Sequence, residues 1–152
     1  MRPQNTEFEI ITKKMKKILF LFVTFLALSS CAPKLTEQVE ARFPNGQPQY
    51  VKTLNKSGDC VKWSEYYETG QLKMEGPMKD GKREGEWKAY LPDGRIKSQG
   101  YFEDGQRTGA AKVYWDNGNL REEGFYKEGK HCGKWRYYDE QGNFLREDDY
   151  GE

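Results

Sequence analysis

Residues 85–108 read GEWKAYLPDGRIKSQGYFEDGQRT, and copies of this 24-residue unit fill the chain after Val39. Alignment of the copies places the same kinds of residue in the same columns. A column of large rings contains Trp63, Trp87, Ala111 and Trp135, the next contains Tyr66, Tyr90, Tyr114 and Tyr138, and a glycine column contains Gly70, Gly94, Gly118 and Gly142. Columns at constant spacing mark a repeat protein, in which each unit is one supersecondary element that its neighbours stabilise.

Two turn signals recur in each unit. The first is a pair such as Asp93-Gly94, which ends in the glycine column, and the second is a pair such as Asp104-Gly105. Asp-Gly and Asn-Gly pairs supply the positive φ angles of a two-residue type I′ hairpin turn. The sequence therefore predicts an all-β fold, an antiparallel meander with two strands per repeat.

The register of the hairpins follows from the first turn. With a two-residue loop, the first three members of the ring column lie opposite a glycine: Trp63 opposite Gly76, Trp87 opposite Gly100, and Ala111 opposite Gly124. A large ring beside a strand glycine compensates for the missing side chain. We therefore expect Gly100→Val to clash with the Trp87 ring and to destabilise the fold by about 1 to 3 kcal/mol. We also expect Trp115, opposite Leu120, to supply the ring that Ala111 lacks.

Alternation along the strands assigns the side chains to two faces. Trp87 and its neighbours at even spacing form an apolar face, and Lys88 and Tyr90 lie on a charged face. The candidate binding face contains Trp63, Trp87, Trp115, Trp135 and Tyr67. The candidate tyrosine ladder contains Tyr66, Tyr90, Tyr114 and Tyr138, of which the first three are expected opposite Lys73, Lys97 and Arg121. Cation–π pairs of this kind stabilise a sheet, and stacked rings could equally form a ligand platform.

These columns resemble the MORN repeat variant family, whose pattern is roughly G-x-W-x-x-Y-x-x-x-G-x-x-x-x-x-G-x-Y-x-x-G. The resemblance covers residues 61–152 as four copies: 61–84, 85–108, 109–132 and 133–152. A degenerate copy at 39–60 precedes them and lacks the tryptophan. The resemblance implies a single-layer, elongated β-sheet. The low mean hydropathy of -1.02 agrees, because one layer has little apolar mass to bury.

The N-terminal segment has the features of an export signal. Met15 begins a basic stretch, an apolar run follows at 18–28, and Leu28-Ser29-Ser30-Cys31 closes it. Residues 1–30 are therefore interpreted as a signal peptide, in which 1–14 are either an extended basic region or lie upstream of the true start at Met15.

The segment Leu28-Ser29-Ser30-Cys31 resembles the bacterial lipobox, which implies that Cys31 is lipidated. The alternative is an ordinary signal peptide with a chance cysteine. Several acyl chains on one cysteine give stable anchoring, and residues 31–38 then form a lipidated tether. Ala32 after the cysteine implies the outer membrane, and we expect the protein to face the periplasm.

Charge argues against a nucleic-acid partner. The whole chain has a formal net charge of +1, and without residues 1–30 that charge is about −2. Nucleic-acid binding needs clustered positive charge, whereas lysine and glutamate alternate here.

Candidates for chemistry are few. His131 is the single histidine and occupies the repeat position of Arg83 and Arg107, so we interpret it as structural. Adjacent acids such as Glu122-Glu123 and Asp148-Asp149 point to opposite faces of a strand, so they form no acid/base pair. We expect no catalytic residue, no metal site and no cofactor.

The cysteines of the repeats cannot bridge each other within one chain. Cys60 and Cys132 lie about six strands apart, or ~29 Å, which is far beyond the reach of a disulfide. Free thiols and pairing between chains both remain open.

Signal, tether and repeats account for the sequence, so we expect a non-enzymatic protein. The leading hypothesis is a lipid-anchored envelope protein, held in the bilayer by acylated Cys31, whose repeat sheet binds another protein through the aromatic face or an open edge strand. The alternative comes from the resemblance, since many bacterial relatives are described as YwqK-type antitoxin components that neutralise a toxin by direct binding. A hydrolase is the third class, and loss of activity on substitution of Glu122, Asp148 or His131 would favour it.

Overall fold

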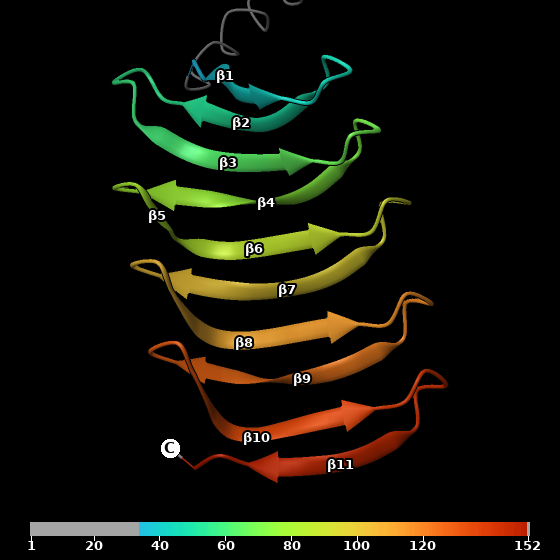
Figure 1. Ribbon diagram of the computed structural model, residues 1–152. Coiled ribbons are helices and arrows are strands. Elements are labelled where there is room, and N and C mark those ends of the chain that lie inside the picture. The colour runs from blue at the N-terminus through green and yellow to red at the C-terminus, as the bar shows by residue number, and fades with distance from the viewer. Residues whose placement is uncertain (1–33, 152) are drawn as a thin grey trace, which may run out of the picture. The chain divides into compact units, whose positions relative to one another are not determined.

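The computed structural model describes residues 34–151, which form one open antiparallel β-sheet of eleven strands (Figure 1). The strands are β1 (Thr36–Arg42), β2 (Pro48–Leu54), β3 (Cys60–Tyr66), β4 (Leu72–Lys79), β5 (Lys82–Arg83), β6 (Gly85–Tyr90), β7 (Ile96–Glu103), β8 (Gln106–Tyr114), β9 (Leu120–Lys127), β10 (Lys130–Tyr138) and β11 (Phe144–Asp149). No helix occurs between residues 34 and 151, so this part of the chain contains no helix that could span a membrane. The predicted signal peptide and Cys31 lie outside the described residues.

The strands follow one another across the sheet in chain order. The order is β1-β2-β3-β4-β6-β7-β8-β9-β10-β11, and the short β5 pairs only with β4. Apart from β5, each strand pairs with the strand that follows it in the chain, as Figure 1 shows, so the predicted single-layer meander is confirmed. Strand β1 begins at Thr36, and the last three residues of the segment interpreted as a tether therefore pair with β2.

The tight turns that lead from one repeat to the next are two-residue type I′ turns, as predicted. Asp80 and Gly81 both have positive φ, at 50° and 75°, and Lys79 pairs directly with Lys82. Asp104-Gly105 and Glu128-Gly129 repeat this geometry. A type I′ turn suits the right-handed twist of the strands that it joins.

The turns within each repeat are wider than predicted. The amide of Leu91 donates to the carbonyl of Arg95 at 2.8 Å, and the amide of Gly94 donates back to the carbonyl of Leu91 at 2.9 Å. The loop therefore contains three residues, of which Gly94 alone has positive φ. The carboxylate of Asp93 accepts from the amide of Arg95 at 3.0 Å, which stabilises the turn locally.

The extra loop residue shifts the pairs next to each wide turn by one position. Away from the turn, Trp63, Trp87 and Ala111 lie opposite Gly76, Gly100 and Gly124, as predicted. Next to the turn, the predicted pairs of tyrosine with Lys73, Lys97 and Arg121 are wrong. The observed pairs are Tyr66 with Leu72, Tyr90 with Ile96, and Tyr114 with Leu120. Trp115 lies in the turn itself, where its amide bonds the carbonyl of Asn119.

A second irregularity separates successive repeats. Between β7 and β8, Gly100 pairs with Ala111 but Tyr101 pairs with Thr108, so Gly109 and Ala110 are additional residues on β8. Gly109 has a φ of 63°, a conformation that favours glycine. Such a bulge bends its strand and redirects the neighbouring side chains.

The core of the sheet is thin. Its buried apolar side chains are Val51, Trp87, Leu91, Ala111 and Trp135. Trp135 is the most enclosed, with 2% of its surface exposed. A single-layer sheet buries only those side chains that its own strands can cover. The tryptophan column therefore provides most of this core.

Candidate binding face

The tryptophan rings cover glycines of the preceding repeat. We call the side of the sheet that carries the ring column, Trp63, Trp87, Ala111 and Trp135, the tryptophan face. The Trp87 ring lies over Gly76, and a Cβ atom added at Gly76 would collide with it. The indole nitrogen of Trp87 donates to the carbonyl of Pro77 at 3.0 Å, which holds the ring in this direction.

The last repeat has the same arrangement. Trp135 lies over Gly124, and its indole nitrogen donates to the carbonyl of Phe125 at 3.0 Å. Each of these rings therefore joins its own repeat to the one before it, and the buried N–H group is satisfied.

The predicted clash between Gly100→Val and the Trp87 ring is consequently wrong. Trp87 pairs with Gly100 along the backbone, but its ring leans away from that glycine and over Gly76. A Cβ atom at Gly100 would meet the Cβ atom of Ala111 at 3.6 Å, which is ordinary contact. The register was predicted correctly and the direction of the side chain was not.

Ala111 leaves Gly100 without a covering ring. A hollow of about 160 Å³ lies here, lined by both glycine and alanine and by Trp87 and Trp135 of the flanking repeats. Trp115 does not fill it, because its indole nitrogen bonds the carbonyl of Tyr138 at 3.1 Å near the wide turn. The expectation that Trp115 replaces the missing ring is therefore wrong.

Arginine and histidine side chains lie on the rings of the tryptophan face. The guanidinium carbon of Arg83 is 4.3 Å from the ring centroid of Trp87. In the last repeat, His131 stacks on Trp135 with their centroids 3.8 Å apart. Arg107 occupies the equivalent position of the repeat that contains Ala111. The predicted apolar face is thus an aromatic face on which arginine and histidine side chains lie.

Arg83 and Arg107 both lie beside the ring of Phe102. Their guanidinium carbons lie 5.3 and 5.6 Å from the centroid of Phe102, and Arg107 also lies 5.2 Å from that of Tyr126. Burial, and after it the like charge of Arg107, lowers the pKa of Arg83. Within residues 34–151, neither guanidinium has a carboxylate oxygen within 4.0 Å.

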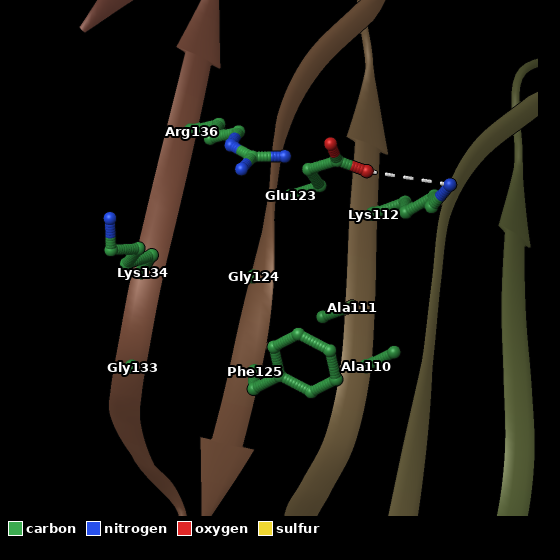
Figure 2. Close-up of a pocket in the computed structure, with 9 residues that line it drawn as sticks. All are labelled: Ala110, Ala111, Lys112, Glu123, Gly124, Phe125, Gly133, Lys134 and Arg136. Carbon is green, nitrogen blue, oxygen red and sulfur yellow. Dashed lines mark ion pairs between the residues drawn. The ribbon is translucent and has the colours of Figure 1, made fainter. Parts of the chain in front are cut away.

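Charges on the opposite side, the lysine–glutamate face, are paired with one another. The ion pairs are Lys62–Glu75, Lys88–Glu86, Lys112–Glu123, Lys134–Glu147 and Arg136–Glu147, at 2.6 to 3.4 Å. A hollow of about 460 Å³ lies on this face. Figure 2 shows the residues that line it, among them Phe125 and the Lys112–Glu123 ion pair. The pairing leaves this face with little free charge to offer a ligand.

The tyrosine ladder belongs to the lysine–glutamate face. The hydroxyl of Tyr90 donates to Glu75 at 3.2 Å, and that of Tyr138 donates to Glu123 at 3.3 Å. Burial, and then the negative charge of the neighbouring glutamate, raises the pKa of both tyrosines. These two tyrosines therefore bond carboxylates of the preceding hairpin.

The five residues predicted to form the binding face differ in exposure. Trp63, Trp115 and Tyr67 are half-buried. Trp87 and Trp135 are buried, with only 4% and 2% of their surface exposed to solvent. Trp87 and Trp135 therefore offer almost no surface to a partner, contrary to their prediction as members of a binding face. The hydroxyl of Tyr67 donates to the carbonyl of Tyr90 at 2.8 Å, so it too links successive repeats.

His131 has an aromatic environment. Its Nε2 atom and the hydroxyl of Tyr126 share a hydrogen bond of 3.1 Å, and the ring of Tyr150 lies 4.9 Å away. Across the described strands and turns, no three His, Cys, Asp or Glu side chains form a group that could hold a metal ion. Cys60 and Cys132 lie on β3 and β10 and are not joined in a disulfide.

A scan of protein-family models matches the model described as MORN repeat variant at residues 60–80, 83–104 and 107–128. The chain contains tandem MORN repeats. The three matched segments correspond to the hairpins β3–β4, β6–β7 and β8–β9. MORN repeats are generally binding or scaffold modules, and the Trp–Gly covering contacts described above join successive MORN hairpins in this chain.

Two solved structures match part of the chain at low similarity. A crystal structure of TarM matches with a TM-score of 0.31 and 9% identity over 74% of this chain. A mutant of S. aureus TarM in complex with fondaparinux, alpha-GlcNAc-glycerol and UDP matches with a TM-score of 0.34 and 10% identity over 76% of this chain. The chain spans 24% and 23% of those two proteins. A search of curated proteins found no match.

Proposed function

We propose that the MORN sheet is a non-catalytic scaffold that binds an acidic surface of another protein through its tryptophan face. The observation that carries this proposal is the contrast between the two faces. On the lysine–glutamate face, cations are neutralised by carboxylates of adjacent strands, whereas Arg83 and Arg107 lie on aromatic rings with no carboxylate within 4.0 Å among residues 34–151.

Electrostatics favours an acidic partner on this face. Arg83 and Arg107 repel each other, which is one cause of the lowered pKa of Arg83. A carboxylate between them would relieve that repulsion, and charge-assisted hydrogen bonds to guanidinium groups are among the stronger polar contacts in proteins. Arginine and aromatic side chains are also enriched at the centres of protein–protein interfaces.

Site-specific crosslinking on the two faces tests the proposal. Met78 pairs with Arg83 next to the tryptophan face, and Phe125 is 54% exposed on the lysine–glutamate face. A benzophenone side chain at position 78 is expected to capture an acidic protein, and the same group at position 125 is the matched control. Mass spectrometry identifies the captured protein.

The captured protein is then purified and its affinity measured by calorimetry. Arg83→Gln with Arg107→Gln is expected to weaken binding by at least about tenfold and to reduce its dependence on salt. Lys88→Gln with Lys112→Gln is the control on the other face. Capture from position 125 alone, or equal affinity for the arginine double variant, would show that this face is not the binding surface.

We further propose that the scaffold is anchored in the bacterial envelope through acylated Cys31, facing the periplasm from the outer membrane. The support is the order of basic stretch, apolar run and small residues before the cysteine. Labelled palmitate is expected to enter the wild-type protein but not Cys31→Ser, and membrane association should be lost with it. Membrane association that persists in unlabelled Cys31→Ser would contradict the anchor.

A further inference from the structure

We propose that Arg83 and Arg107 together bind an acidic segment of the partner protein, which lies across the strands in the polyproline II conformation and has two acidic residues three positions apart. The inference rests on the binding role proposed for the tryptophan face and names the kind of segment that the face recognises. Each arginine holds one of the two carboxylates.

The two arginines belong to a row of side chains in which polar groups and aromatic rings alternate. Phe102 pairs across the strands with Arg107, and Tyr126 pairs with His131. The guanidinium carbon of Arg83 lies 5.3 Å from the ring centroid of Phe102, and that of Arg107 lies 5.2 Å from the centroid of Tyr126. We call this row, Arg83, Phe102, Arg107, Tyr126 and His131, the arginine ladder. It crosses the strands of the tryptophan face close to the tight turns.

The rings position the arginines without using their hydrogen-bond donors. Arg83 lies 4.3 Å from the ring centroid of Trp87 as well as beside Phe102, so its guanidinium group has two aromatic neighbours. A cation–π contact occupies no hydrogen-bond acceptor, so the N–H groups remain available to a ligand. Arg83 is half-buried and Arg107 is exposed, so solvent reaches both side chains. Both guanidinium groups are therefore positioned and accessible.

The charge of the two arginines has no carboxylate partner within the described residues. Between residues 34 and 151, neither guanidinium has a carboxylate oxygen within 4.0 Å. Burial and then the charge of Arg107 lower the pKa of Arg83, and the charge of Glu65 acts in the opposite direction. Glu65 is itself paired with Lys73 at 2.6 Å. Carboxylates of a partner would supply the complementary charge, whereas a basic segment would be repelled.

The distance between the arginines sets the distance between those carboxylates. Arg83 and Arg107 occupy the same position of successive repeats, so two strand spacings separate them, or about 9.4 to 9.8 Å. Their contacts of 5.3 and 5.6 Å with the centroid of Phe102, which lies between them, agree with this separation. A guanidinium–carboxylate pair places its two carbon atoms about 4 Å apart, so a single carboxylate is too short to contact both groups. One acidic residue for each arginine is therefore required.

A polyproline II segment matches this distance best. With three residues per turn and a rise of about 3.1 Å, it places residues three positions apart on one side at about 9.3 Å. Residues on one side of a strand are about 6.7 Å apart, and those one and two turns apart on a helix are separated by about 6 and 10.5 Å. Prolines also pack on aromatic rings, which Phe102 and Tyr126 provide beside Arg107. We therefore expect a sequence of the type Glu-Pro-Pro-Glu.

Two peptides of equal composition test the spacing. The probe is acetyl-Pro-Pro-Glu-Pro-Pro-Glu-Pro-amide, and the control is acetyl-Pro-Pro-Glu-Pro-Glu-Pro-Pro-amide, in which the acids are two positions apart. Binding to the full-length protein is followed by NMR titration of the backbone amides and the arginine Nε–H groups. We expect the largest shift changes at Arg83 and Arg107, and binding of the control at least about fivefold weaker. Equal affinities would overturn the proposal.

Three further ligands test the conformation and the class of partner. A peptide with glycine in place of every proline keeps the spacing but loses the preformed conformation, so it should bind at least about threefold more weakly than the probe. A helical peptide with glutamates seven positions apart should also bind more weakly. Equal or tighter binding of either peptide would overturn the polyproline II conformation. Tighter binding of polygalacturonate, an acidic polysaccharide, would overturn a protein segment as the ligand.

Variants that move the arginine pair along the ladder give the sharpest test. Arg83→Gln should weaken binding of the probe at least about fivefold, and Arg136→Gln on the lysine–glutamate face is the control. Adding His131→Arg to Arg83→Gln restores two arginines at the same spacing, one repeat further along, and should restore the affinity. A folded double variant that binds no better than Arg83→Gln would overturn the proposal. Arg107→Gln should weaken binding as much as Arg83→Gln, and it decides the matter if the double variant does not fold.

The outcomes also separate this inference from the function on which it rests. Arg83→Gln with Arg107→Gln should remove the preference for the probe over the control peptide. If the wild type shows no such preference and the double variant binds both peptides weakly, the spacing is wrong and the acidic docking face stands. If the double variant binds every acidic ligand as well as the wild type does, both proposals are wrong.

Discussion

The last repeat and the repeat that begins at Gly109 differ in the ring column, where one has Trp135 and the other has Ala111. In the last, Trp135 lies over Gly124 and His131 stacks on the tryptophan. In the other, Ala111 takes the place of the tryptophan and no ring lies over Gly100, yet β8 pairs with both β7 and β9. Turns and bulges are therefore sufficient to form the hairpin.

The comparison shows what the ring contributes. Trp135 lies over a glycine of the preceding hairpin and bonds the carbonyl of Phe125, so it joins two repeats and buries their shared surface. Omission of one ring in the middle of the sheet opens a hollow between two covered repeats. A repeat protein tolerates such a gap because each unit is also stabilised by its other neighbour.

The largest expected effect is the removal of a covering ring. Trp135→Ala should lower the free energy of unfolding by about 3 to 5 kcal/mol, since it empties the most buried site of the sheet. Chemical denaturation measures the change, and Trp115→Ala is the control because that ring is half-buried at a turn. Equal losses of unfolding free energy for the two variants would show that the contact between Trp135 and Gly124 stabilises the protein no more than the packing of Trp115 at its turn.

A smaller effect is expected from adding a methyl group beneath the ring. Gly124→Ala should cost about 1 to 3 kcal/mol, because the new Cβ atom would displace the Trp135 ring. Gly100→Ala should change stability by less than about 1 kcal/mol, since its added Cβ atom would meet the Cβ atom of Ala111 at 3.6 Å, an ordinary contact distance. Thermal unfolding of the two variants gives the comparison, and similar melting temperatures would contradict it.

Restoring the ring should act in the opposite direction. Ala111→Trp is expected to stabilise the protein by about 0.5 to 2 kcal/mol, a typical gain for filling a cavity. The ring would extend over Gly100 as Trp135 extends over Gly124. Unfolding in denaturant measures the gain. Destabilisation of a folded Ala111→Trp variant would mean that the hollow is too small for the ring.

The smallest expected effect concerns the titration of Tyr137 in the last repeat. The hydroxyls of Tyr137 and Tyr150 share a hydrogen bond of 3.4 Å, which with burial raises the pKa of Tyr137 to about 12 from an ordinary value of 10.0. The unfolded chain loses this proton first, so the contribution to stability is present below pH 10 and is lost as the pH rises to about 12. Absorbance at alkaline pH should show one late-titrating tyrosine.

Substitution at the partner tyrosine is the control for that titration. Tyr150→Phe removes the hydroxyl that bonds Tyr137 and should move the late titration toward the ordinary pKa of tyrosine. A late step that survives in Tyr150→Phe but not in Tyr137→Phe would assign the shift to burial alone.

Several features of the candidate site were predictable because they depend on neighbours in sequence. Alternation along a strand places Trp87 and Lys88 on opposite faces, and the hairpin register places Trp87 opposite Gly100. The position shared by Arg83, Arg107 and His131 is also visible in the repeat. What could not be predicted is the hollow, because its recognition requires knowing which way the tryptophan rings lean.

By itself the sequence determined the all-β meander, the hairpins and the type I′ turn at Asp80-Gly81, because turn chemistry and alternation are local properties of the chain. Tertiary structure alone decided that the Trp87 ring covers Gly76 and that Arg107 lies between the rings of Phe102 and Tyr126. The two-residue bulge between repeats redirects the side chains, and packing against the neighbouring hairpin selects their rotamers. Neither effect is encoded within a single repeat.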